Sequence, residues 1–169
     1  MRIHSFGAVI NERARVLICG TAPSVKSLEH RQFYGHPQNF FWPLIYQLFG
    51  ESEADPIYEN RIAFLQEHRL ALWDVIESCE REGSLDINIK AAVPNPIPEL
   101  VKRYPGLRCI AFNGSKAYDT FRKHFRDDPI FQSMTLLKMP STSPIPTPKM
   151  RSLEDRAAVW KEIVPYTLN

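Results

Sequence analysis

Short apolar runs alternate with amphipathic stretches along most of the chain. The runs are uninterrupted and end in polar or turn-forming residues, as do strands buried in a parallel sheet. They cover residues 16–20, 70–73, 107–112 and 134–139. Apolar residues at helical spacing, capping residues or both mark helices at 40–49, 58–68, 95–103, 115–125 and 152–164. Strands that alternate with helices predict an α/β fold, a single-domain three-layer α/β/α structure over residues 1–169 with a central four-stranded parallel sheet.

Two of the predicted helices have recognisable starts. Asn95 and Pro96 have the order of an N-cap followed by a first-turn proline. Ser152 and Asp155 resemble a capping box. Both pairs predict where a helix begins.

Polar residues or tight turns follow all four predicted strands. They are Thr21 to Ser24, Asp74, Asn113 with Gly114, and Ser141 to Ser143. In open α/β sheets, ligands bind beyond the carboxyl ends of the strands. We therefore expect these four exits to form one site.

Residues 34–43 are the most unusual stretch, with four aromatic rings, one histidine and two carboxamides in ten residues. Rings combined with carboxamides suit a flat ligand that forms hydrogen bonds, such as a nucleobase. Asn39 can orient a water molecule or cap the following helix, and the residues alone leave both open. Phe41 is a core residue or a platform for a base, and His36 is expected to stabilise its own loop.

The strand exits also allow ordinary structural roles. Asp74 can accept a hydrogen bond from a base or cap the next segment, and Asn113 can bind a ligand or cap a helix. The stretch 140–144, which contains Ser141, Thr142 and Ser143 between prolines, suits a phosphate, although such stretches are usually turns.

Composition narrows the functional classes. The formal net charge is +2, but residues 102–126 hold seven Lys or Arg and one acid, whereas 51–86 hold ten acids and three Arg. A one-sided basic face is typical of nucleic-acid binding, and solvated helix faces of opposite sign explain it equally well.

Other site chemistries lack their motifs. The three cysteines are far apart, which indicates free thiols and a cytoplasmic protein. Neither metal-ligand spacing nor a dinucleotide-binding glycine motif is present, so we expect no metal and no cofactor. The chain also lacks an apolar run long enough to span a membrane, and the usual order of a signal peptide.

Taken together, several motifs resemble the uracil-DNA glycosylase superfamily. Gly-Thr-Ala-Pro-Ser at 20–24 resembles its first motif, and Met-Pro-Ser-Thr-Ser-Pro at 139–144 its second. His-Pro-Gln-Asn-Phe-Phe-Trp at 36–42 is similar to a run in the mismatch-specific uracil glycosylases. The strings at 72–75, 78–86 and 112–114 are similar to those of the hypoxanthine-DNA (deoxyinosine) glycosylase family. The likeness covers nearly the whole chain.

The departures from the superfamily pattern concern catalysis. Other branches carry a catalytic Asp, Asn or Glu in the first motif, where this chain has Thr21 and Ala22. Met139 stands where uracil-specific members have histidine, and Ser24 replaces a glycine. The resemblance to the deoxyinosine branch implies that Asn39 is the catalytic residue.

The resemblance implies a DNA repair enzyme that flips a deaminated base out of DNA and hydrolyses its N-glycosidic bond. Hypoxanthine is the expected base, with uracil and xanthine as further candidates. Asn39 would direct the water, and the base would contact Phe41, Asn113, Asp74, Thr21 and Ala22. The DNA would contact Ser141, Thr142, Ser143, Lys149 and Arg151, with Ile145 as the wedge.

Because no lysine is placed as a nucleophile, we expect a monofunctional glycosylase, acting as a monomer on DNA that contains deaminated bases. Two alternatives stay open. One is a non-catalytic protein that binds damaged DNA on the same fold, and the other is an α/β protein that binds a small nucleotide.

Overall fold

A central sheet of four parallel strands organises the fold in the computed structural model, which describes residues 1–168. The four strands are those that the buried apolar runs predict, and their order in the sheet is β3-β2-β6-β7. The strands are β2 (Val16–Gly20), β3 (Leu70–Asp74), β6 (Cys109–Asn113) and β7 (Thr135–Met139). All five residues of β2 are buried, because this strand is covered on both faces and flanked on both edges.

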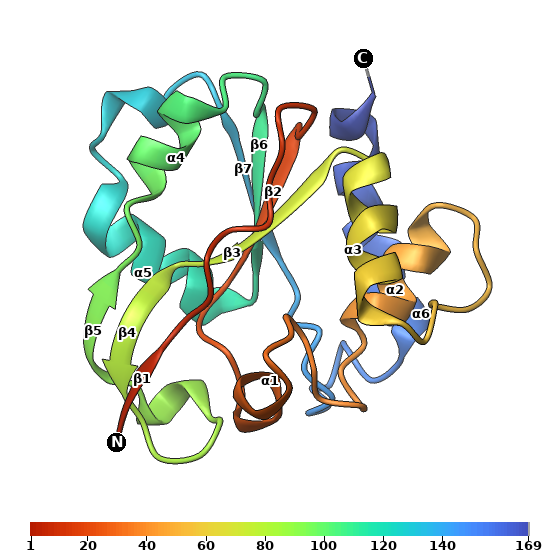
Figure 1. The fold of residues 1–169 in the computed structure, drawn as a ribbon, viewed down its shortest axis with the longest axis horizontal. Helices are drawn as coiled ribbons and strands as arrows, with labels where there is room; N and C mark the ends of the chain where they lie inside the picture. Colours follow the sequence, from red (N-terminus) through yellow and green to blue (C-terminus); the bar gives the residue numbers. More distant parts are fainter. Residues whose placement is uncertain (169) are drawn as a thin grey trace.

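Helices cover both faces of this sheet, so the predicted three layers are present (Figure 1). Alternate residues of β2 point to opposite faces: Val16 and Ile18 belong to one apolar cluster, and Leu17 and Cys19 to the other. On the first face lie α2 (Phe41–Leu48), α3 (Tyr58–Glu67) and α6 (Leu153–Trp160), followed by the 3-10 helix η3 (Lys161–Thr167). On the second face lie α4 (Ile97–Arg103), α5 (Ser115–Phe125) and the short η2 (Pro129–Phe131).

A second sheet, absent from the sequence prediction, extends the fold beyond the carboxyl end of β3. Its antiparallel order is β1-β4-β5, formed by β1 (Arg2–His4), β4 (Ile76–Glu80) and β5 (Lys90–Pro94). Ile3, Ile76 and Cys79 form its small buried cluster. The loop between β4 and β5 contains the 3-10 helix η1 (Asp86–Asn88), and this loop reaches back towards the end of β2.

The two predicted helix starts have different outcomes. The capping box of α6 is confirmed: the Ser152 side chain accepts from the backbone N–H of Asp155, whose carboxylate accepts from the backbone N–H of Ser152. The predicted Asn95 cap is wrong, because Pro96 precedes the first turn of α4. Asn95 instead donates from Nδ2 to the carbonyl of Asp74, at 2.7 Å, and so joins α4 to the end of β3.

The sequence prediction also missed the short helix α1 (Val25–His30), whose N-cap is Ser24. Cys19, Cys79 and Cys109 are buried free thiols, as predicted. Among residues 1–168, no helix combines the length and the apolar character that a membrane span requires.

Candidate active site

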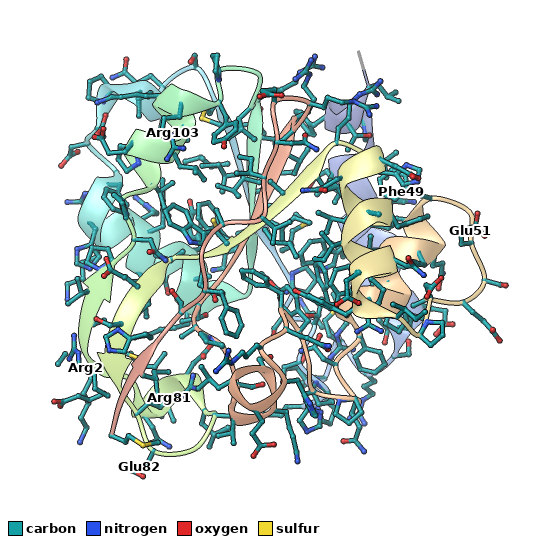
Figure 2. The ribbon with its side chains drawn as sticks, viewed as in Figure 1. Arg2, Phe49, Glu51, Arg81, Glu82 and Arg103 are labelled. Carbon is teal, nitrogen blue, oxygen red and sulfur yellow. The ribbon has the colours of Figure 1, made fainter. Side chains whose placement is uncertain are left out.

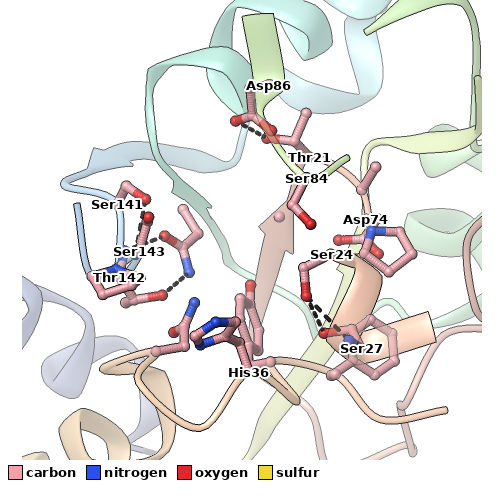
Figure 3. A pocket seen from close by; sticks show the side chains of 18 of the residues that line it. Thr21, Ser24, Ser27, His36, Asp74, Ser84, Asp86, Ser141, Thr142 and Ser143 are labelled. Carbon is pink, nitrogen blue, oxygen red and sulfur yellow. Dashed lines mark hydrogen bonds between the residues drawn. The ribbon is translucent and has the colours of Figure 1, made fainter. Parts of the chain in front are cut away.

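The exits of all four parallel strands border one cavity of about 520 Å³. The segments that line it come from the loops after β2, β3, β6 and β7, from the stretch before α2, and from the β4–β5 loop. In Figure 3, Thr21 and Asp86 lie on one side of this cavity, His36 lies opposite, and Ser141 to Ser143 form a third side. The structure thus brings together the strand exits that the sequence singled out.

Tyr34, rather than Phe41, is the ring of the 34–43 stretch that lines the cavity, and Phe6 and Phe33 line it as well. Phe41 has no exposed surface and lies in the core, so the expectation that its ring contacts a base is wrong for this conformation. Tyr34 stacks on it with ring centroids 3.9 Å apart and planes 20° from parallel. The backbone of Tyr34 is left-handed (φ 55°), which is strained for a bulky residue and is common at functional sites. The cavity wall is therefore Tyr34, supported from behind by Phe41.

Asp74 and Tyr34 place two unsatisfied polar atoms at the end of β2. Asp74 Oδ2 and the Tyr34 hydroxyl are buried, and neither has a hydrogen-bond partner that meets the usual geometry among residues 1–168. Gly20 makes room for both: a Cβ atom there would lie 2.7 Å from Asp74 Oδ1 and 3.0 Å from the Tyr34 oxygen. Burial, and then the charge of Asp86, raise the pKa of Asp74 to about 7, against the influence of Arg81. Burial also raises the pKa of Tyr34, and the nearby Asp74 charge adds to this effect.

Asn113 is held in one orientation by Thr142. Its Nδ2 donates to Thr142 Oγ1 at 2.9 Å, and its Oδ1 accepts from the Thr142 backbone N–H at 2.9 Å. This pair identifies the two ends of the amide, and the second N–H of Nδ2 lies near the Tyr34 hydroxyl. Thr142 belongs to the cavity lining but is only 1% exposed, and its hydroxyl is engaged with Asn113.

Asn39 lines the cavity and also stabilises the start of α2. Its Oδ1 accepts from the backbone N–H of Phe41 at 2.9 Å, an Asx turn that leads into the helix. The N-cap itself is Phe40, so the predicted N-cap position of Asn39 is off by one residue. The Asn39 carbonyl oxygen has a second lone pair, and its amide N–H groups have no partner within the described chain, so the side chain can also orient a water molecule.

The loop after β7 is braced from within by α6. Arg156 is 1% exposed, and its guanidinium donates to the carbonyls of Ser141 (2.9 Å) and Ser143 (2.8 Å). Trp160 Nε1 donates to the carbonyl of Pro140 at 2.8 Å. The planar guanidinium has several N–H donors and can bind more than one carbonyl at once, so the buried charge of Arg156 has hydrogen-bond partners.

The remaining predicted residues lie at the rim or beyond it. Thr21, Ala22, Ser141, Ser143 and Ile145 line the cavity, and Ile145 is 58% exposed. The structure leaves Lys149 and Arg151 outside the cavity lining, exposed on the segment that leads to α6. His36 also lines the cavity, and its Nδ1 accepts from the backbone N–H of Gln38 at 3.1 Å, the predicted loop interaction.

Comparison with known proteins identifies the family. The family model for the uracil DNA glycosylase superfamily matches residues 8–164, nearly the whole chain. The chain belongs to this superfamily.

Individual relatives of this superfamily member are similar over different shares of the chain. A hypoxanthine DNA glycosylase of Methanosarcina barkeri is 33% identical over 165 residues, 96% of this chain and 98% of the relative. One of Methanosarcina acetivorans is 41% identical over 112 residues, 66% of this chain and 71% of the relative. A solution NMR structure of a candidate uracil DNA glycosylase from M. acetivorans has a TM-score of 0.79 and 33% identity, and the match covers 96% of this chain and 99% of that one.

Several residues of the site in this glycosylase could not be predicted from its sequence. Tyr34 was counted only as one ring of the aromatic stretch, and Arg156 gave no signal beyond its place in a predicted helix. Asp86 lines the cavity and accepts a hydrogen bond from Thr21 Oγ1 at 3.2 Å, across 65 positions of sequence. The string at 78–86, which carried part of the resemblance, was the available signal for Asp86. Among residues 1–168, the His, Cys, Asp and Glu side chains form no cluster of three that could hold a metal ion.

Proposed function

We propose that this DNA glycosylase removes hypoxanthine from deoxyinosine in DNA, by hydrolysis of the N-glycosidic bond of a flipped nucleotide. The observation that carries the proposal is the cavity at the strand exits, where one aromatic wall meets a fixed amide, a buried carboxyl and a second amide. The relatives named hypoxanthine DNA glycosylase support the choice of base.

The cavity is suited to one planar base. The C1′ atom of a nucleotide in the duplex is shielded by the stack, so the nucleotide has to leave it, at a cost of about a few kcal/mol that is smaller for mispaired bases. The exposed face of Tyr34 would stack on the flipped base, with Phe41 behind it. Stacking of a base on an aromatic side chain contributes about 1–3 kcal/mol and is largely independent of the base.

The polar groups of the cavity would read the edge of the base. Asn113 and Asp74 both line the cavity: the second N–H of Asn113 can donate to a carbonyl oxygen or to a ring nitrogen of a base, and an ionised Asp74 can accept from an N–H. Hypoxanthine offers both features, N1–H and the carbonyl at C6, whereas adenine offers an acceptor at N1 and an amino group at C6. The arrangement therefore favours the deaminated base over adenine.

Asn39 would orient the attacking water. When the C1′–N bond breaks, the sugar becomes an oxocarbenium-like cation and the departing base carries negative charge. Donors such as the Asn113 amide stabilise that charge. Ile145 at the rim would occupy the space that the flipped nucleotide leaves, and Ser141 and Ser143 would contact a phosphate beside it.

The test uses duplex oligonucleotides that contain deoxyinosine, deoxyuridine or deoxyxanthosine, incubated with excess enzyme. We expect abasic product from the deoxyinosine duplex, at a higher rate than from the other two. Release of no base from any duplex would refute the glycosylase function and leave a DNA-damage binder or a nucleotide-binding protein. A faster reaction with deoxyuridine would refute the proposed base preference.

Asn39→Ala tests the proposed catalytic residue, with Ser152→Ala as the matched control. Both substitutions remove a side-chain hydrogen bond at the start of a helix, at about 1 kcal/mol of stability, but Ser152 lies outside the cavity lining. We expect Asn39→Ala to lower the single-turnover rate by about 100-fold or more, and Ser152→Ala to leave the rate unchanged. Equal rates in the two variants would mean that Asn39 only stabilises the start of α2.

A further inference from the structure

Hydrolysis of the glycosidic bond requires a group that takes a proton from the attacking water. A neutral carboxamide cannot do this near neutral pH, so Asn39 can orient the water but cannot accept its proton. Within the described part of the chain, the titratable side chains that line the cavity are Tyr34, His36, Asp74 and Asp86.

We propose that Asp86 is a second catalytic residue, the carboxylate that accepts this proton; the role rests on the proposed glycosylase function. Asp86 lines the cavity from the β4–β5 loop and is exposed to solvent. Its Oδ2 accepts from Thr21 Oγ1 at 3.2 Å, which brings the carboxylate to the exit of β2 (Figure 3). Oδ1 has no partner within the described chain and can accept from a water molecule.

The loop that carries Asp86 is fixed to the loop after β2 at two further points. The guanidinium of Arg81 donates to the carbonyl of Pro23, and the backbone N–H of Val25 donates to Ser84 Oγ at 2.9 Å. Arg81 is 3% exposed and lies beside α1, where β4 ends (Figure 2). Its Nε also donates to the carbonyl of Gly83 at 2.8 Å, which sets the turn before Asp86. These contacts hold the carboxylate in place before any ligand binds, as an efficient catalytic group requires.

The charges around Asp86 come from three elements. Asp74 at the end of β3 repels it, while Arg81 at the end of β4 and Lys116 on α5 favour its ionised form. Partial burial of the carboxyl group raises its pKa above the ordinary value, and the Thr21 hydrogen bond and the two cations act in the opposite direction. A carboxylate whose pKa lies above the ordinary value is a stronger base than a free one, which suits proton transfer near neutral pH.

Of the other titratable groups, Asp74 and Tyr34 meet the requirement less well, and His36 is the alternative that the experiment has to exclude. Asp74 is 4% exposed, and in the proposed function its carboxylate accepts from the N–H of the base, so it is already engaged when the water attacks. Burial raises the pKa of Tyr34, and its neutral hydroxyl is a poor proton acceptor. In His36, Nδ1 accepts from the backbone N–H of Gln38, and Nε2 has no partner in the part of the chain that the structure describes. His36 lies across the cavity from Asp86 (Figure 3).

The proposed step balances as follows. The water oxygen bonds to C1′, and the C1′–N bond breaks with its electron pair leaving on the base. One water proton passes to the Asp86 carboxylate and from there to solvent. The departing base takes up a proton from solvent after release.

The experiment compares single-turnover rates from pH 5 to pH 9 for the wild type, Asp86→Asn, Asp86→Glu and His36→Gln. Asp127→Asn serves as the control for loss of a surface charge, since that side chain is 96% exposed. We expect Asp86→Asn to lower the plateau rate at high pH by about 100-fold or more, the usual contribution of a general base. Asp86→Glu should recover part of the rate, and Asp127→Asn should be unchanged. Binding to a duplex with a tetrahydrofuran abasic analogue should be retained in every variant.

The plateau rate distinguishes catalysis from an indirect effect. If Asp86 only repels Asp74, its substitution moves the midpoint of the pH profile to lower pH and leaves the plateau unchanged, and that result would overturn the proposal. A similar loss in His36→Gln but not in Asp86→Asn would assign the proton to the histidine and also overturn it. In both cases the wild type still releases base, so the proposed function stands. A wild type that is inactive on every duplex refutes both.

Discussion

Asp74→Asn should make the protein more stable at pH 8 but not near pH 4.5. The pKa of Asp74 is raised from the ordinary carboxyl value of 3.8 to about 7 in the folded protein. This shift corresponds to about 4 kcal/mol in the free energy of unfolding, at roughly 1.36 kcal/mol per pKa unit. Because the pKa is raised in the folded state, folded Asp74 retains a proton between these values that the unfolded chain has lost. The free energy of unfolding therefore falls as pH rises from about 4 to 7. Above pH 7 the folded protein contains a buried, unpartnered carboxylate, and asparagine removes that charge.

Urea denaturation of the wild type and of Asp74→Asn at both pH values measures the effect. We expect a gain of about 2–4 kcal/mol at pH 8, below the full 4 kcal/mol because a buried amide also needs partners, and a gain close to zero near pH 4.5. The same gain at both pH values would show that ionisation of the buried Asp74 carboxyl does not destabilise the folded protein. A more stable variant that also loses its preference for deoxyinosine would mean that Asp74 is retained for the base and not for the fold.

Three further substitutions test the contacts around the cavity. Thr142→Val leaves one N–H of Asn113 without its acceptor, so urea denaturation should show a loss of stability of about 1–3 kcal/mol, and base release should be slower. An unchanged rate of base release would show that the Thr142–Asn113 hydrogen bond is not needed for base recognition. Arg156→Lys keeps the charge but loses the planar fork, and a loss of about 2–4 kcal/mol is expected, with weaker binding to the abasic-analogue duplex. Gly20→Ala places a Cβ atom 2.7 Å from a carboxylate oxygen of the cavity, so base release should fall and stability should drop by about 1–3 kcal/mol. Gly7→Ala, where a Cβ atom meets nothing within 4 Å, is the matched control.

The central sheet could be predicted because each of its strands is a buried apolar run, and the positions of the strand exits follow from parallel topology. The second sheet could not, because β1 has only three residues and the pairing of β4 with β5 shifts register on either side of Ser78. Short, irregular strands do not produce the two-residue alternation by which strands are recognised.

Site residues that directly follow a strand could be predicted from the sequence. Site residues that reach the cavity only through tertiary packing could not. Phe41 and Tyr34 are both rings of the same stretch, and only the turn of the backbone at Tyr34 determines which one faces the cavity. Asp86 approaches Thr21 across 65 positions of sequence, through a loop with no helical or strand pattern. Arg156 resembles any helix-surface arginine until the loop that it holds is known.

The way in which the loop after β7 is held affects how this surface can change during evolution. Arg156 and Trp160 bind the backbone carbonyls of Pro140, Ser141 and Ser143, and a carbonyl is present whatever side chain the residue carries. Replacement of Ser141 or Ser143 therefore removes a hydrogen bond within the loop but keeps the bonds that join the loop to α6. The β4–β5 loop, in contrast, is joined to the loop after β2 through the side chains of Ser84 and Asp86. One wall of the cavity thus stays attached to the fold when its side chains change, while the opposite wall loses its attachment.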